Sequence, residues 1–121
     1  MTRPASEFLP LKNDAVLILL VVAARPCHGY AIMREVEARS DGAVVLQTGA
    51  LYRELKRLLG DGLIEECAAP RDAESDDDRR RYYRATNLGR SVLSAEADRM
   101  AALVRAARHV TAAKTRLAHT I

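Results

Sequence analysis

Cationic side chains gather in two short stretches of the sequence, and their spacing is the first indication of chemistry. In the first stretch, Tyr52, Arg53, Lys56 and Arg57 share one helix face, opposite an apolar stripe of Leu51, Leu55, Leu58 and Leu59. The second stretch is an arginine cluster made of Arg79, Arg80, Arg81 and Arg84. Because such cations bind phosphates and a single helix fits the major groove, both stretches indicate double-stranded DNA as the ligand.

The residues of the first stretch can be given roles along one helix. Thr48 and Gly49 stand at its start, where free backbone N–H groups favour a phosphate. Arg53 has the fork geometry that reads a guanine. Tyr52 either offers its hydroxyl to DNA or packs half-buried against the protein. A charged surface helix without any ligand would show the same pattern, so the face alone leaves both interpretations open.

The arginine cluster falls on the return strand of a predicted hairpin. Alternation along a strand places Arg80, Tyr82 and Arg84 on one face and Arg81, Tyr83 and Ala85 on the other, so only one set can meet DNA. The preceding loop carries carboxylates at Asp72, Glu74, Asp76, Asp77 and Asp78. Since DNA would repel these carboxylates, the loop folds back over the arginines, points away from DNA, or serves only solubility.

Catalysis is not expected from this sequence. The histidines, His28, His109 and His119, are scattered, and there is neither a Ser-His-Asp arrangement nor a glycine-rich loop that could cradle a phosphate. No carboxylate pair stands in an apolar setting. We therefore predict a protein that is not an enzyme and needs no cofactor.

Two other function classes remain as alternatives. A metal- or thiol-responsive sensor would need Cys27, His28 and Cys67 to converge, although their spacing matches no known ligand pattern. Otherwise the two cysteines are reduced, partly buried thiols. A protein-interaction module that uses the acidic loop is the third hypothesis, and an assay of DNA binding separates it from the first.

The composition favours one small helical domain. The chain has 121 residues, of which 49% are hydrophobic and only 4% aromatic, so its core must be built from aliphatic side chains. A net charge of +3 is a weak indication of an anionic partner. The apolar run at residues 15–24 is about half the length of a bilayer span and no cationic leader precedes it, so we expect a cytoplasmic protein.

Periodicity and capping signals predict the order of the elements. Residues 1–12, interrupted by Pro4 and Pro10, are expected to form an arm. Helices are predicted at 14–24, 30–39 and 49–60, the first capped by Asn13 and the third capped by Thr48 and ended at Gly62. Strands are predicted at 63–68 and 80–85. Thr86 caps a last helix, which the tail at 110–121 either continues or follows as one more short helix.

The last predicted helix has the pattern of a helix that pairs with another helix. Leu93, Ala97, Met100, Val104 and Ala107 alternate spacings of four and three, as in a coiled-coil seam. The order α-α-α-β-β-α describes a mainly α fold with a small β-hairpin, which is a winged helix-turn-helix. We predict an N-terminal arm at 1–12, a DNA-binding domain at 13–85 and a C-terminal dimerisation helix at 86–121.

Several stretches together resemble a known family. They are His28-Gly29-Tyr30 with Ile32, Gly49-Ala50-Leu51-Tyr52 with Leu55 and Leu58, Gly62-Leu63-Ile64, and Arg81-Tyr82-Tyr83 with Thr86 and Gly89. Over residues 13–107 the chain resembles the PadR-like transcriptional regulators with a short C-terminal part. The chain departs from the family pattern at Thr48, where members often carry Pro, and at Ala50, where they often carry Thr. Its last helix also lacks the Trp that some small members place in the dimer pocket.

The resemblance implies a homodimeric repressor whose long C-terminal helix packs against the first helix of the other subunit. It also implies a small hydrophobic or aromatic effector, bound between the first and last helices. Val16, Leu20, Met100 and Val104 are candidates to line that pocket, or else they fill the dimer core. A twofold dimer would place its two recognition helices about one DNA turn apart, ~34–36 Å, on an inverted-repeat operator.

Overall fold

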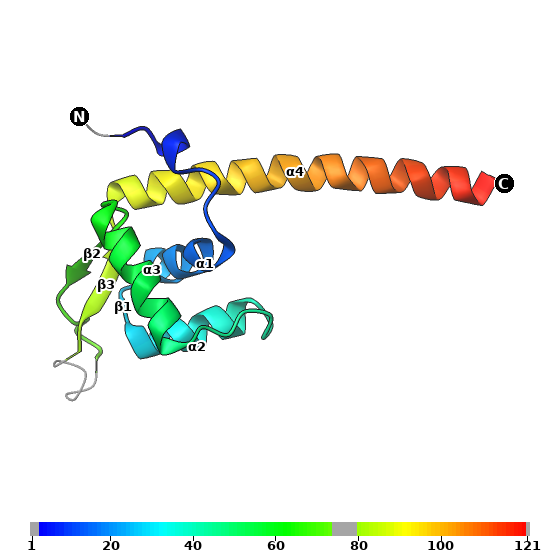
Figure 1. Cartoon of the computed structure of the whole chain (residues 1–121). Helices are drawn as coiled ribbons and strands as arrows, with labels where there is room; N and C mark the ends of the chain where they lie inside the picture. Colours follow the sequence, from blue (N-terminus) through cyan, green and yellow to red (C-terminus); the bar gives the residue numbers. More distant parts are fainter. Residues whose placement is uncertain (1–2, 74–79, 121) are drawn as a thin grey trace.

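The order of helices and strands agrees with the sequence pattern. The computed structural model describes residues 3–73 and 80–120, with side chains described as far as Ala113. Its elements are the 3₁₀ turn η1 (Ala5–Phe8), α1 (Asn13–Ala24), β1 (Cys27–His28), α2 (Gly29–Arg39), α3 (Thr48–Gly60), β2 (Ile64–Cys67), β3 (Tyr82–Ala85) and α4 (Asn87–Thr120). The predicted class is confirmed, because helices dominate around a small antiparallel sheet and a long helix ends the chain (Figure 1).

Two of the three predicted helix caps are wrong. Helices α1 and α3 each begin one residue earlier than predicted, so Asn13 and Thr48 are the first helical residues and not the caps. The residues that do occupy the cap positions, Lys12 and Gln47, make no side-chain hydrogen bond to the helix. The third cap is confirmed, since the Gly89 N–H donates to Thr86 Oγ1 at 3.0 Å. Gly62 has the positive φ of 75° that suits a helix end and only glycine adopts readily.

The sheet has one strand more than the predicted hairpin. Within the described residues its antiparallel order is β1-β3-β2, so that β3 lies between the other two strands. The predicted pairing of β2 with β3 is present, with Ile64 opposite Ala85. The added strand β1 places Cys27 opposite Tyr83. Two residues are too few for alternation to be visible in a sequence, so β1 could not be found there.

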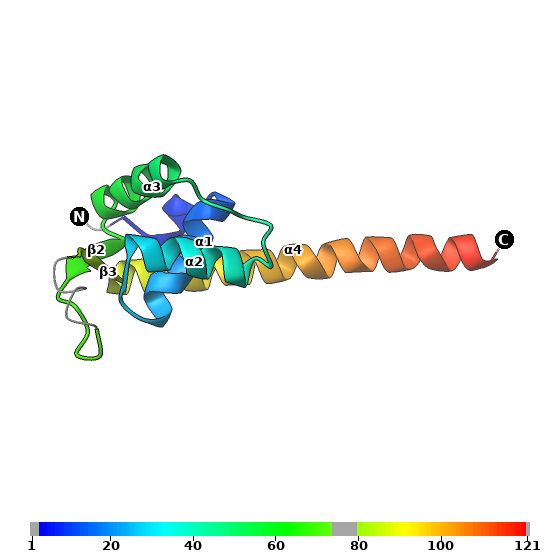
Figure 2. The same cartoon turned by 90° about the horizontal axis from the view of Figure 1, so that it is seen from below.

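Helix α1 lies at the centre of the domain and is apolar nearly all round. Ile18, Leu19 and Val22 are fully buried, and the stripe of α3 that includes Leu51 and Leu55 is buried in the same core. Figures 1 and 2 show α1 between α4 on one side and the pair α2–α3 on the other. The predicted apolar stripe of α3 therefore faces inward, which turns the cations of that helix to solvent.

Helix α4 is longer than the domain that it leaves. Its 34 residues span about 50 Å, and the tail continues the helix rather than forming a separate one. Every side chain at residues 101–112 is exposed, and this half projects away from the other elements (Figure 2). Among the described residues, no helix is both long enough and apolar enough to cross a membrane.

Candidate nucleic-acid interface

The outer face of α3 is cationic along its length. Tyr52, Arg53, Lys56 and Arg57 are all exposed, as the periodicity predicts. The first backbone bond of the helix runs from the Leu51 N–H to the Gln47 carbonyl at 2.9 Å. Ahead of it stand the N–H groups of Thr48 and Gly49, both exposed, at the positive end of the helix dipole. This end of α3 can therefore hold a phosphate beside the arginine face.

Arg53 and Tyr52 occupy different surroundings on that face. A Cβ placed on Gly49 would lie 3.6 Å from Arg53 Nη1, so the guanidinium lies over the first turn of α3. A Cβ placed on Gly29 would lie 2.8 Å from the Tyr52 hydroxyl, so that hydroxyl touches the start of α2. Since half of the Tyr52 side chain is exposed, its ring both packs against α2 and borders the cationic face.

Arg57 is held by a carboxylate on its own helix. Arg57 Nη1 lies 3.8 Å from Glu54 Oε1, one turn earlier. Glu54 is buried, and its other oxygen has no hydrogen-bond partner among the described residues. Sequence reasoning did not single out Glu54, because a glutamate next to an arginine on an amphipathic helix is usually a surface residue. Of the three cations on α3, Arg57 is thus the one already engaged within the protein.

The arginines of the wing, defined as β2, β3 and the loop between them, are engaged across the sheet. Arg84 Nε lies 3.0 Å from Glu65 Oε1, and Arg81 Nη1 lies 3.5 Å from Glu66 Oε1. These two pairs lie on opposite faces of β3, in agreement with the predicted alternation. Sequence reasoning missed both glutamates. In the observed register Glu65 lies directly opposite Arg84, whereas Glu66 lies opposite Tyr83 and reaches Arg81 diagonally. Arg79 lies outside the described residues.

Arg80 connects the wing to the helix-turn-helix. Its Nη1 lies 3.0 Å from His28 Nε2, at the start of α2. His28 Nδ1 accepts the Ala31 N–H at 3.2 Å and so caps α2, while the His28 ring meets the Tyr82 ring edge-on at 5.4 Å. The wing and α2 therefore share one imidazole, which fixes the sheet beside the recognition helix.

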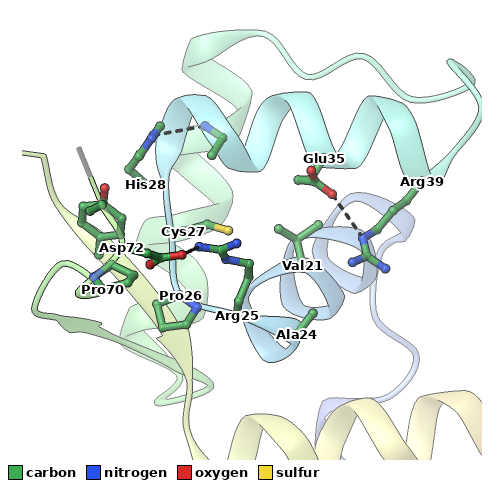
Figure 3. Close-up of a pocket in the computed structure, with 13 residues that line it drawn as sticks. Val21, Ala24, Arg25, Pro26, Cys27, His28, Glu35, Arg39, Pro70 and Asp72 are labelled. Atoms are coloured by element: carbon green, nitrogen blue, oxygen red, sulfur yellow. Dashed lines mark hydrogen bonds and ion pairs between the residues drawn. The ribbon is translucent and has the colours of Figure 1, made fainter. Parts of the chain in front are cut away.

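A hollow of about 380 Å³ lies between the end of α1, helix α2 and the stem of the wing (Figure 3). Within it Arg25 Nη2 pairs with Asp72 Oδ2 at 3.2 Å, and Arg39 pairs with Glu35 at 3.7 Å. Asp72 thus folds back onto the helical domain. The other loop carboxylates, Glu74, Asp76, Asp77 and Asp78, lie outside the described residues.

The predicted convergence of Cys27, His28 and Cys67 is not found. His28 and Cys67 both pair with Tyr82, but from opposite sides, so that the whole width of β3 separates them. Among residues 3–73 and 80–120, no three His, Cys, Asp or Glu side chains come close enough to hold a metal ion. Burial raises the pKa of both thiols above its ordinary value, which lowers their reactivity.

A second, apolar groove runs between α1 and α4, with a volume of about 460 Å³. It is lined by Val16, Leu20, Ala23, Arg90, Leu93, Ser94, Ala97 and Met100. Five of the seven residues predicted for the effector or dimer interface therefore line one groove. The other two, Val104 and Ala107, lie beyond it on the projecting half of α4, where both are exposed.

Comparison with known proteins identifies the family. The model of the transcriptional regulator PadR-like family matches residues 18–95, which run from α1 through the wing into the first turns of α4. The chain belongs to the PadR-like family. An uncharacterized protein of Lysinibacillus sphaericus is 32% identical over 78 residues, which cover 64% of this chain and 69% of that protein. PadR-like regulators bind DNA and are generally not enzymes.

Solved structures share the fold, and two of the three described here are PadR regulators. A PadR family transcription regulator of Clostridium difficile superposes with a TM-score of 0.69 at 23% identity, covering 83% of this chain and 99% of that one. A PadR-like regulator of Bacillus cereus gives a TM-score of 0.67 at 21% identity, with 80% and 89% covered. RosR of H. salinarum gives 0.62 at 23% identity, with 92% and 97% covered. The arrangement of the helices, the wing and the long α4 is thus that of the PadR fold.

Proposed function

We propose that this PadR-like regulator is a homodimeric repressor that binds an inverted-repeat operator through α3. The observation that carries the proposal is the outer face of α3. Among the residues that the structure describes, Arg53 and Lys56 have no ion-pair partner, and both are exposed beside the open N-terminal turn of the helix. A face of this kind can place one guanidinium on a base edge while backbone N–H groups hold the phosphate.

The wing would add phosphate contacts at the edge of the groove. Arg81 and Arg84 are paired with glutamates, but these pairs are about half exposed and are worth little in water. A phosphate can therefore replace a glutamate at small cost. Residues 13–85 would then form the DNA-binding domain, a role that requires both the helix and the wing.

The exposed apolar side chains of α4 support a homodimer. Leu103 is 60% exposed and Val110 is 64% exposed, and both lie on the half of α4 that no other described element covers. A solvent-exposed helix with such a row of apolar residues needs a partner helix. A second copy of α4, with α1 of that copy, is the cover that the groove between α1 and α4 fits best. Residues 86–121 would serve dimerisation.

The same groove is a candidate binding site for the effector. Its volume lies within the range of small-molecule sites, and its lining is almost entirely apolar. A small hydrophobic or aromatic compound bound there would alter the contact of α4 with α1 and hence the separation of the recognition helices. If the partner subunit fills the groove completely, these residues form the dimer core instead.

Selection of bound duplexes from a random pool tests the proposal, followed by gel shifts on the selected duplex. Arg53→Ala should weaken binding by about 1–3 kcal/mol and relax the preference at one base pair. Lys56→Ala should weaken binding to all sequences and lower the salt slope by about one. Arg105→Ala, an exposed cation on the projecting part of α4, is the matched control and should leave the affinity for a duplex with a single half-site unchanged.

Two results would contradict the proposal. Selected duplexes without twofold symmetry, bound by one protein chain, would exclude the dimeric operator complex. Unchanged duplex affinity in Arg53→Ala and Lys56→Ala would show that α3 does not make the contacts.

A further inference from the structure

A glutamate is completely buried where α4 leaves the domain. Glu96 is 0% exposed. Its Oε2 accepts the Leu11 backbone N–H at 2.6 Å, and its Oε1 accepts a charge-assisted hydrogen bond from Arg99 Nε. A carboxylate taken out of water is tolerated only when hydrogen bonds and an opposite charge compensate it. The Leu11 N–H therefore has to stay in place for Glu96 to remain buried.

Leu11 belongs to the N-terminal arm, which here means residues 3–12. The arm crosses α4, with η1 on one side of that helix and α1 on the other (Figure 1). Phe8 is buried in the domain core, and the Arg3 guanidinium lies 4.2 Å above the centre of its ring. Helix α4 is thus held between α1 and an arm that is fastened by Phe8 and by the bond to Glu96.

Glu96 lies where α4 leaves the domain, so a small change in the angle of the helix there displaces its far end by several ångströms. It is the last buried residue among the α4 side chains that the structure describes, since Asp98 is exposed, Arg99 and Met100 are partly exposed, and residues 101–112 are exposed. The 24 residues from 97 to 120 extend about 36 Å beyond it. A tilt of about 10° at Glu96 would move the far end of α4 by about 6 Å, nearly the rise of two base pairs.

We propose that Glu96 is a positioning residue that fixes, through the arm, the direction in which α4 leaves the DNA-binding domain. In the homodimer, on which this inference rests, that direction sets the separation of the two recognition helices. Glu96 and the arm therefore determine which spacing of half-sites the protein accepts. Both lie outside residues 18–95, the part of the chain that matches the family model.

The test uses the full chain and duplexes made from the selected operator. One duplex has the preferred half-site spacing, others have one or two base pairs inserted or removed at the centre, and one has a single half-site. The variants are Glu96→Ala, Glu96→Gln and Phe8→Ala, with Asp98→Ala as the matched control of an exposed carboxylate on the same helix. Circular dichroism establishes which variants are folded at the assay temperature.

We expect Glu96→Ala and Phe8→Ala to lose about tenfold in affinity for the preferred spacing, because rigid linkage of two sites supplies affinity that a loose linkage does not. Affinity for the single half-site should stay unchanged, and the altered spacings should be bound nearly as well as the preferred one. Glu96→Gln keeps an acceptor for the Leu11 N–H and should retain most of the spacing preference. Asp98→Ala should behave as the wild type.

Equal losses on the single half-site and on the inverted repeat would overturn the inference, since they indicate general destabilisation. An unchanged spacing profile in the folded Phe8→Ala and Glu96→Ala variants would overturn it as well. Should the wild type bind a single half-site as tightly as the inverted repeat, the homodimer itself is refuted. The inference then fails together with the homodimer. Because this outcome is read from the wild type and not from the variants, it is distinguishable from a failure of the inference alone.

Discussion

Gly89 is the position where one added methyl group should damage the protein most. It lies in the first turn of α4, against the start of β2. A Cβ there would overlap the Leu63 carbonyl oxygen and lie 2.9 Å from its carbon and 3.3 Å from Leu19 Cδ1. Since carbon atoms in contact stay about 3.5 Å apart or more, the carbon–carbon distance alone requires the backbones to separate by ~0.6 Å, and the overlapping Leu63 oxygen requires more.

The cost can be worked out from the groups that would move. Overpacking costs about 1–3 kcal/mol. The Leu63 carbonyl also accepts the Thr86 N–H at 3.1 Å, and loss of that bond adds about 1 kcal/mol. We therefore expect Gly89→Ala to lower the free energy of unfolding by about 2–4 kcal/mol. A domain of ordinary stability has only about 5–15 kcal/mol in total.

Thermal unfolding followed by circular dichroism, at one fixed protein concentration, measures the effect. For a chain of this length a loss of 1 kcal/mol lowers Tm by about 3–6 °C, so Gly89→Ala should lower it by roughly 10 °C. Gly60→Ala is the control, because it ends α3 and a Cβ there meets nothing within 4 Å. It should be neutral or gain up to about 1 kcal/mol from helix propensity. Equal Tm values for the two variants would refute the close approach of α4 to β2.

Three further changes have expected outcomes. Gly29→Ala should weaken operator binding by pushing against the Tyr52 hydroxyl, and adding Tyr52→Phe should restore affinity in a gel shift. Glu65→Gln should tighten DNA binding and steepen its salt dependence, because it releases Arg84 for phosphate; a weaker complex would contradict this. Iodoacetamide should label Cys27 at pH 8 more slowly in the native protein than in urea, since burial raises its pKa and lowers the thiolate fraction. Mass spectrometry measures the labelling, and equal rates would show that the thiol is accessible.

The parts of the fold that repeat with a period were predictable. Helices α1, α2 and α3 each lie within a residue or two of the predicted bounds, because apolar stripes and glycine stops mark them. The two wrong caps show the limit of local signals: Asn13 and Thr48 have suitable side chains, but each helix starts early enough to include them. A capping residue is chosen by backbone geometry as much as by its chemistry.

The position of the candidate site was predictable from the sequence, but the ion pairs that the wing arginines make were not. The cations of α3 face solvent as expected, but the partners of Arg81 and Arg84 follow from strand register, which the sequence does not fix. Glu96 was beyond prediction for a related reason. A glutamate in a long helix reads as exposed, and only the arm, 85 residues away in the sequence, makes its burial possible.

The contacts of α4 also decide how a signal could travel through this molecule. Within the described residues its first four turns touch the base of the wing at Leu63, the arm through Glu96 and the groove beside Leu20. In the described part of the chain, every α4 side chain from residue 101 to 112 is exposed. A compound that entered the groove would therefore push on a rigid helix held at two other points. The close contact of Gly89 with Leu63 leaves no room for sliding, so α4 would swing about that contact and pull against the bond between Glu96 and Leu11. A variant that loosens this bond should then respond to an effector less strongly than the wild type does, even though it binds the compound equally well.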